Sequence, residues 1–63
     1  MSASVVDIVK ALSRAYTDEG VVIVLTSPHM HFGLRTPLEM CTTAAGRKKV
    51  LAWAESLDGM IST

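Results

Sequence analysis

The four residues Thr36–Glu39, with the sequence Thr-Pro-Leu-Glu, together favour the start of a helix. A threonine hydroxyl can accept a hydrogen bond from the free amides of a first helical turn, and Pro37 already has the φ that a helix needs. Glu39 can accept a hydrogen bond from the Thr36 amide and lies at the positive end of the helix dipole. The sequence therefore predicts a helix that begins after Thr36 and runs to about Thr42.

The chain is short and rich in apolar residues, with 63 residues of which 49% are hydrophobic. A domain of this size buries only about 60% of the surface that its unfolded chain exposes. The single cysteine, Cys41, cannot form an internal disulfide and is typical of a reducing cytoplasm. We therefore expect one cytoplasmic domain over residues 1–63, whose spare apolar surface is covered by a second copy in a homo-oligomer or by another protein.

The charge balance disfavours two classes of partner. Six basic and six acidic residues give a formal net charge of zero, whereas nucleic-acid-binding modules of this size carry a basic excess. The basic cluster Arg47–Lys49 is interpreted as a solvated face. The chain starts without the basic region of a secretory signal, and the apolar run 21–25 is too short to cross a bilayer. We expect neither nucleic-acid nor membrane binding.

Apolar residues recur at helical spacing at both ends of the chain. Ser4 and Asp7 indicate a helix start, and the pattern after them predicts a helix over residues 5–16. Near the other end, Ala44–Gly46 is expected to interrupt the helix that begins after Thr36, and a last helix follows that has Gly59 as its C-cap. The apolar face of this last helix comprises Val50, Trp53, Ala54, Leu57 and Ile61.

The middle of the chain is less clear, because residues 21–25 have the β-branched composition of a strand. Thr17 or Asp18 can cap a helix before this run, and Ser27-Pro28 can end one. A single strand would have no partner in so small a chain, so we predict a helix. Residues 27–35 are expected to form a loop. The fold predicted from all these patterns is all-α, a compact bundle of about four short helices.

His29, His31 and Cys41 are the residues of the loop and its surroundings with metal-ligating or nucleophilic side chains. His29 and His31 could ligate a metal with Cys41, but their spacing matches no standard zinc pattern, and alternate residues of an extended chain point to opposite sides. Cys41 could also act as a nucleophile. A lone cysteine is more often a small buried hydrophobic residue. We therefore predict no metal, no cofactor and no catalytic residue, and expect a protein that is not an enzyme.

Several large apolar side chains have two interpretations each. Trp53, the only tryptophan, is expected to be the largest core side chain or, alternatively, an anchor at an interface. The methionines at positions 30, 40 and 60 are interpreted as core filling, with adaptable contact surface as the alternative. The sequence thus indicates a small helical interaction module.

The order of motifs from Tyr16 to Met60 resembles the toxin-binding domain of the Xre/MbcA/ParS antitoxin family. Members of that family usually have a hydrophobic residue before a Gly-Gly-Arg-Thr-Pro-Leu segment, for which this chain has Phe32 followed by Gly-Leu-Arg-Thr-Pro-Leu. The other matching motifs are Asp18–Val22, Leu25–Pro28, Gly46 with Val50-Leu51, and Leu57–Met60.

This resemblance implies a helical domain that binds and silences a RES-domain toxin, an enzyme that depletes cellular NAD. In the family, the C-terminal part of the domain helps to obstruct the NAD pocket of the toxin. Residues 53–63 would then be the blocking element, and the loop from His29 to Arg35 a second contact. The partner-binding residues predicted in this way are Arg35, Trp53, Leu57, Gly59, Met60 and Ile61.

Two other functions stay open beside this one. The same helical scaffold could serve a phage or bacterial regulator that binds a different host protein, because a scaffold does not fix a function. A small DNA-binding dimer that uses the Arg47–Lys49 cluster is a third possibility, which the neutral net charge disfavours.

Overall fold

The computed structural model of the protein describes the backbone of residues 4–61 and the side chains of residues 4–57. All regular elements in this part of the chain are helices, which confirms the predicted all-α bundle. The elements in chain order are α1 (Val5–Ser13), α2 (Asp18–Thr26), the 3₁₀ helix η1 (Met30–Phe32), α3 (Pro37–Met40) and α4 (Ala44–Ile61). No helix within residues 4–61 combines the length and the apolar character needed to cross a bilayer.

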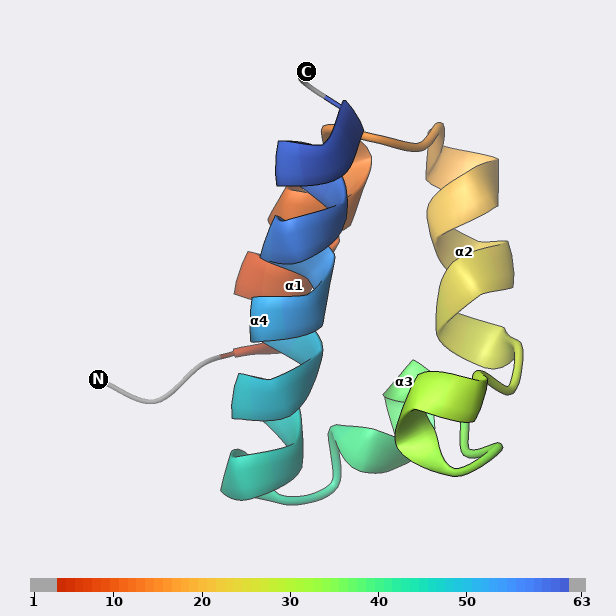
Figure 1. Cartoon of the computed structure of the whole chain (residues 1–63), viewed down its shortest axis with the longest axis vertical. Helices are drawn as coiled ribbons and strands as arrows, with labels where there is room; N and C mark the ends of the chain where they lie inside the picture. The colour runs from red at the N-terminus through yellow and green to blue at the C-terminus, as the bar shows by residue number, and fades with distance from the viewer. Residues whose placement is uncertain (1–3, 62–63) are drawn as a thin grey trace.

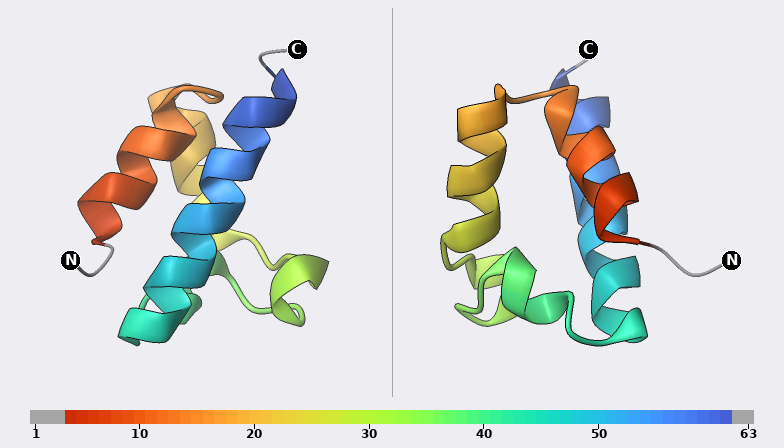
Figure 2. Two further views of the ribbon diagram at one scale, coloured as in Figure 1. Left: turned by 60° about the vertical axis from the view of Figure 1, so that its left-hand side comes forward. Right: turned by 180° about the vertical axis from the view of Figure 1, so that it is seen from behind.

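Two helices, α1 and α4, form a closely packed pair, and α2 lies beside this pair (Figure 1). α1 packs more extensively on α4 than any other two helices pack on each other, and the two lie side by side in Figure 2. α2 runs along one flank of this pair. η1 and α3 join the lower end of α2 to the first turn of α4, which closes the bundle at that end (Figure 1).

The core lies where α1 faces α4 and α2 covers the pair. Ile8 and Leu12 are one turn apart on α1, as are Val50 and Ala54 on α4, and all four side chains are completely buried. Spacing of i and i+4 places each pair on one helical face, so the two faces meet. The other buried apolar residues of this cluster are Ala11, Val21, Leu25, Phe32 and Cys41.

Side-chain caps begin the helices as the sequence predicts. Thr36 Oγ1 accepts a hydrogen bond from the Glu39 amide at 3.1 Å, and the Thr36 amide donates to Glu39 Oε1 at 3.3 Å, with Pro37 in the first turn. Ser4 and Asp7 form the same reciprocal pair at the start of α1. These caps satisfy amides that the helix itself leaves free, so the positions of the helix starts are fixed locally.

The helical prediction for residues 21–25 is confirmed, since they lie inside α2. Thr17 Oγ1 accepts from the Gly20 amide at 3.1 Å, and two acidic residues follow in the first turn. The cap and the favourable dipole interaction thus prevail over the β-branched composition of the run.

Three predictions about the extent of helices and loops are wrong. The helix predicted over residues 5–16 ends at Ser13, and the loop predicted over 27–35 contains η1. Gly59 is not a C-cap, because α4 continues through it to Ile61.

A fourth prediction is also wrong, because Ala44–Gly46 does not separate two helices but forms the first turn of α4. Thr43 caps this turn, since its Oγ1 accepts from the Gly46 amide at 3.0 Å. A Cβ atom on Gly46 would overlap the carbonyl oxygen of Met40 at the end of α3. Gly46 is therefore required by the close approach of α3 to α4, and its presence does not mark a helix end.

Candidate protein-binding surface

Residues 29–35 form a short closed loop, here called the 29–35 loop, which stands out from the foot of the bundle (Figure 2, left). An antiparallel bridge joins its ends, with the His29 amide donating to the Arg35 carbonyl oxygen at 3.2 Å. Within the loop, the Leu34 amide donates to the His29 carbonyl oxygen at 3.0 Å, and the Gly33 amide to that of Met30 at 3.1 Å. The backbone of the loop is thus held by its own hydrogen bonds.

Aromatic packing fastens the loop to the bundle. Phe32 is buried, and its ring meets the Trp53 indole edge-on with the centroids 5.2 Å apart. The His29 ring lies 5.0 Å from the indole, and its Nε2 is 3.2 Å from the Val24 carbonyl oxygen. Trp53 is therefore the support on which the loop rests, because edge-to-face pairs of this kind stabilise a fixed ring arrangement.

The two most exposed large apolar side chains of the described residues belong to this loop. Met30 is 88% exposed and Leu34 is 69% exposed. Leu34 also has a φ of 67°, next to Gly33 with a φ of 65°. A left-handed conformation costs a non-glycine residue roughly 1–2 kcal/mol. The exposed Leu34 side chain can recover little of that cost by packing within the chain.

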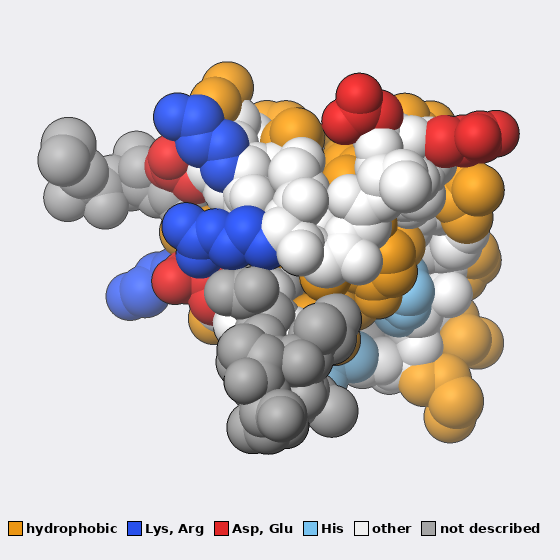
Figure 3. Space-filling view, turned by 90° about the horizontal axis from the view of Figure 1, so that it is seen from above, with side chains coloured by type: hydrophobic (Ala, Val, Ile, Leu, Met, Phe, Trp, Pro, Cys, Tyr) orange, Lys and Arg blue, Asp and Glu red, His pale blue; other side chains and the backbone are white. Residues whose placement is uncertain are grey.

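Other exposed apolar side chains lie on the helices that flank the loop. Val22 and Ile23 on α2 are 60% and 58% exposed, whereas Val21 and Leu25 of the same helix are buried. Figure 3 shows hydrophobic side chains gathered along the α2 side, whereas Lys and Arg lie over α1 and α4. The exposed apolar set of the α2–α3 region comprises Val22, Ile23, Met30, Leu34 and Leu38.

The residues predicted to bind a partner occupy two different environments. Arg35 is exposed at the end of the 29–35 loop, next in sequence to Leu34. Trp53 and Leu57 are half-buried and pack against the core cluster. Gly59, Met60 and Ile61 lie in the last turn of α4, and their side chains are outside the described residues.

Sequence reasoning missed Val22, Ile23 and Leu34 as exposed residues. A signal for the first two was present, because the run 21–25 is apolar on every face of a helix that can bury only one face in a small bundle. For Leu34 the neighbouring Gly33 gave only a weak indication of a left-handed turn.

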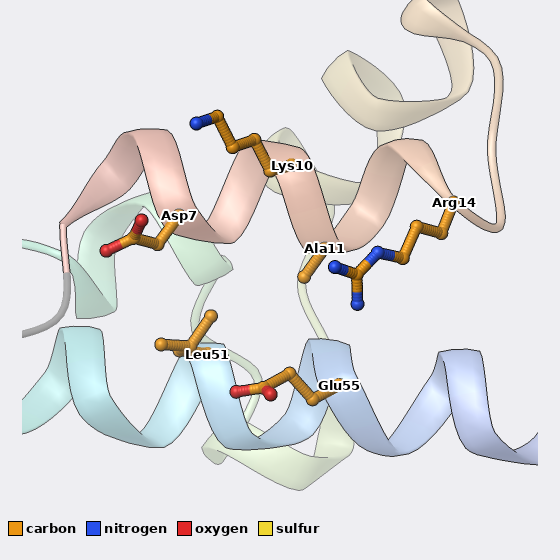
Figure 4. A pocket seen from close by; sticks show the side chains of 6 residues that line it. All are labelled: Asp7, Lys10, Ala11, Arg14, Leu51 and Glu55. Carbon is orange, nitrogen blue, oxygen red and sulfur yellow. The ribbon is translucent and has the colours of Figure 1, made fainter.

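Two surface hollows are lined by charged side chains. One of about 220 Å³ lies between α1 and α4 and includes Asp7, Lys10, Arg14 and Glu55. Figure 4 shows Arg14 and Glu55 pointing into the space between the helices and Lys10 pointing away. The other, of about 310 Å³, lies between α3 and α4 and includes Arg35, Glu39 and Lys49. Each hollow therefore combines both signs of charge.

Cys41, the one candidate nucleophile, is a buried free cysteine. Burial raises the pKa of the Cys41 thiol above its ordinary value, and the positive charge of Arg47 opposes this shift in part. A buried thiol with a raised pKa is protonated at neutral pH and reacts slowly. Within residues 4–61, no three side chains of metal-ligating type come together.

Comparisons of this chain with protein-family models, with curated proteins and with solved structures found no match. The resemblance to the antitoxin family thus stays a prediction from the motifs.

Proposed function

We propose that this chain is a non-enzymatic, antitoxin-like binding domain that neutralises a RES-domain, NAD-depleting toxin by covering its active site. The observation that carries the proposal is the exposed apolar set of the α2–α3 region, on a bundle whose core is already closed between α1 and α4. The order of the motifs from Tyr16 to Met60 supplies the class of partner.

Covering a site requires surface and no reactive group. Burying apolar area contributes about 25 cal/mol per Å², and a stable interface covers about 800 Å² on each partner. The exposed apolar set can supply the dry centre of such an interface. Arg35 at its border can pair with a carboxylate of the toxin. The end of α4, which resembles the blocking element of the family, would obstruct the NAD pocket.

Co-expression with a RES-domain toxin tests the proposal. We expect the chain to restore growth and cellular NAD, and to co-purify with the toxin. Val22→Asp should abolish the rescue, because it places a charge within the exposed apolar set. Val6→Asp on α1 is a matched control, since Val6 is 61% exposed and lies outside the set. Failure to rescue or co-purify with any RES-domain toxin encoded beside a natural copy of the gene would reject the proposal.

A specific observation favours a second candidate function, a regulator of a different host protein. Leu34 stands where the antitoxin family usually has the second glycine of its Gly-Gly-Arg segment. An exposed leucine there changes the surface that a partner meets. Affinity purification from host cells, followed by binding measurements with the purified components, separates the two functions.

Self-association also stays a prediction. Light scattering at two protein concentrations tests it, and a mass that rises with concentration would show that copies of the chain cover one another.

A further inference from the structure

Three sulfur atoms that can be oxidised lie among the described side chains, those of Met30, Met40 and Cys41. Met30 is 88% exposed in the 29–35 loop, whereas Met40 is half-buried and packs against the core cluster. Cys41 belongs to that cluster and is buried. An oxidant dissolved in water therefore reaches the sulfur of Met30 more readily than either of the others.

A cysteine is ordinarily the first sulfur to react, because a thiolate is a stronger nucleophile than a thioether. Here burial raises the pKa of the Cys41 thiol, although the positive charge of Arg47 opposes this shift in part. The thiol therefore keeps its proton at neutral pH and below. Burial also keeps a dissolved oxidant away from its sulfur atom. The fold thus removes the usual competitor of Met30.

The 29–35 loop does not use the Met30 side chain to hold its shape. Met30 contributes its carbonyl oxygen, which accepts a hydrogen bond from the Gly33 amide at 3.1 Å. The antiparallel bridge joins the ends of the loop, and Phe32 fastens the loop to Trp53. A polar oxygen added to the Met30 sulfur would face water, so no desolvation cost opposes it.

We propose that Met30 is the site at which peroxides modify this protein, and that its oxidation makes the 29–35 loop more polar while the bundle stays folded. The thioether sulfur attacks one oxygen of hydrogen peroxide, and a sulfur–oxygen bond forms as the oxygen–oxygen bond breaks. The departing hydroxide takes the proton of the transferred oxygen and leaves as water. The sulfur loses two electrons to the peroxide. The resulting sulfoxide is polar where the thioether is apolar.

Peptide mapping tests the site. The full chain is treated with hydrogen peroxide at about pH 6, where the thiolate fraction is small, and is then digested with trypsin for mass spectrometry. Cleavage after Arg35 separates Met30 from Met40 and Cys41, which share a peptide and are distinguished by its fragmentation. We expect Met30 to gain an oxygen several times faster than Met40 or Cys41. In denaturant, the rates at the two methionines should become equal, because both sulfur atoms are then exposed.

Hydrophobic-interaction chromatography and thermal unfolding test the consequence. The oxidised wild type should elute earlier than the untreated protein, and its melting temperature should change by less than about 4 °C, as for a surface substitution. Met30→Leu, given the same treatment, should lose most of this elution shift. Met40→Leu is the matched control and should shift as the wild type does. Sulfoxide reductases should restore the elution of the wild type.

The inference is overturned if Met40 or Cys41 of the folded chain gains oxygen as fast as Met30, or if denaturant leaves the preference for Met30 unchanged. It is also overturned if Met30→Leu keeps the full elution shift, or if oxidation unfolds the wild type but not Met30→Leu. These measurements use the purified chain alone. Their outcome is therefore independent of the proposed binding function, which can fail without affecting them.

Discussion

The α1–α4 pair and the region from α2 to α3 make different use of apolar residues. In the pair, the faces that carry Ile8, Leu12 and Val50 are completely buried, as a folding core requires. In the α2–α3 region, α2 is apolar on its outer face as well, and the 29–35 loop leaves Met30 and Leu34 in water. The completely buried side chains of the core thus come mainly from the pair. The α2–α3 region exposes five large apolar side chains among the described residues, whereas α1 exposes three, Val5, Val6 and Val9.

The junction between the two regions should be the most sensitive position. In Gly46→Ala, the new Cβ would overlap the Met40 carbonyl oxygen, so α3 and α4 would have to separate. A domain of this size has a free energy of unfolding of about 3–9 kcal/mol, and we expect a loss of about 3 kcal/mol or more. Denaturant unfolding followed by circular dichroism measures it. The neighbouring Ala45→Gly serves as the control and should cost about 1 kcal/mol. An unchanged midpoint for Gly46→Ala would contradict the close approach.

Truncating one valine in each region tests the comparison directly. Val50 on α4 is completely buried, and Val50→Ala should lower the free energy of unfolding by about 2 kcal/mol because it removes packed methyl groups. Val22→Ala on α2 removes the same atoms from an exposed position. This substitution should change the free energy of unfolding by less than about 0.5 kcal/mol. Thermal or denaturant unfolding gives both values. Equal losses for the two variants would mean that Val22 contributes to folding and that the comparison is wrong.

The smallest expected effect concerns the cap that begins α3. Thr36→Ala removes the acceptor of the Glu39 amide and should cost about 1 kcal/mol. Thr42→Ala is a suitable control, because the Thr42 hydroxyl only donates to the Glu39 carbonyl oxygen at 3.0 Å, and its loss should cost less than about 0.5 kcal/mol. Unfolding midpoints separate the two. A larger loss for Thr42→Ala would show that the cap does not hold this region.

Local chemistry explains the parts of the fold that the sequence predicts well. The caps at Ser4, Thr17 and Thr36 involve residues within three positions of one another, so their hydrogen bonds can be inferred from the order of the residues. The same cap at Thr17 decides between helix and strand for residues 21–25. The face of α4 that carries Val50 and Ala54 follows from helical spacing.

Non-local geometry explains the parts that the sequence did not predict. Gly46 looks like a helix breaker until the position of the Met40 carbonyl oxygen is known. The candidate surface was predicted only in part, at Arg35 and through the 29–35 loop. The conformation of Leu34 depends on a bridge closed by His29 and Arg35, and no propensity of leucine indicates it.

Different residues of the 29–35 loop hold its shape and form its exposed surface, and this separation has a consequence for how such proteins diversify. His29, Phe32 and Arg35 maintain its shape through the bridge and the aromatic contacts, and the His31 ring packs edge-on against Phe32, whereas Met30 and Leu34 are largely exposed. Substitutions at Met30 and Leu34 could redirect the protein to a new target while the scaffold beneath stays intact. Evolution, or a protein engineer, would then have a small variable region mounted on a constant frame.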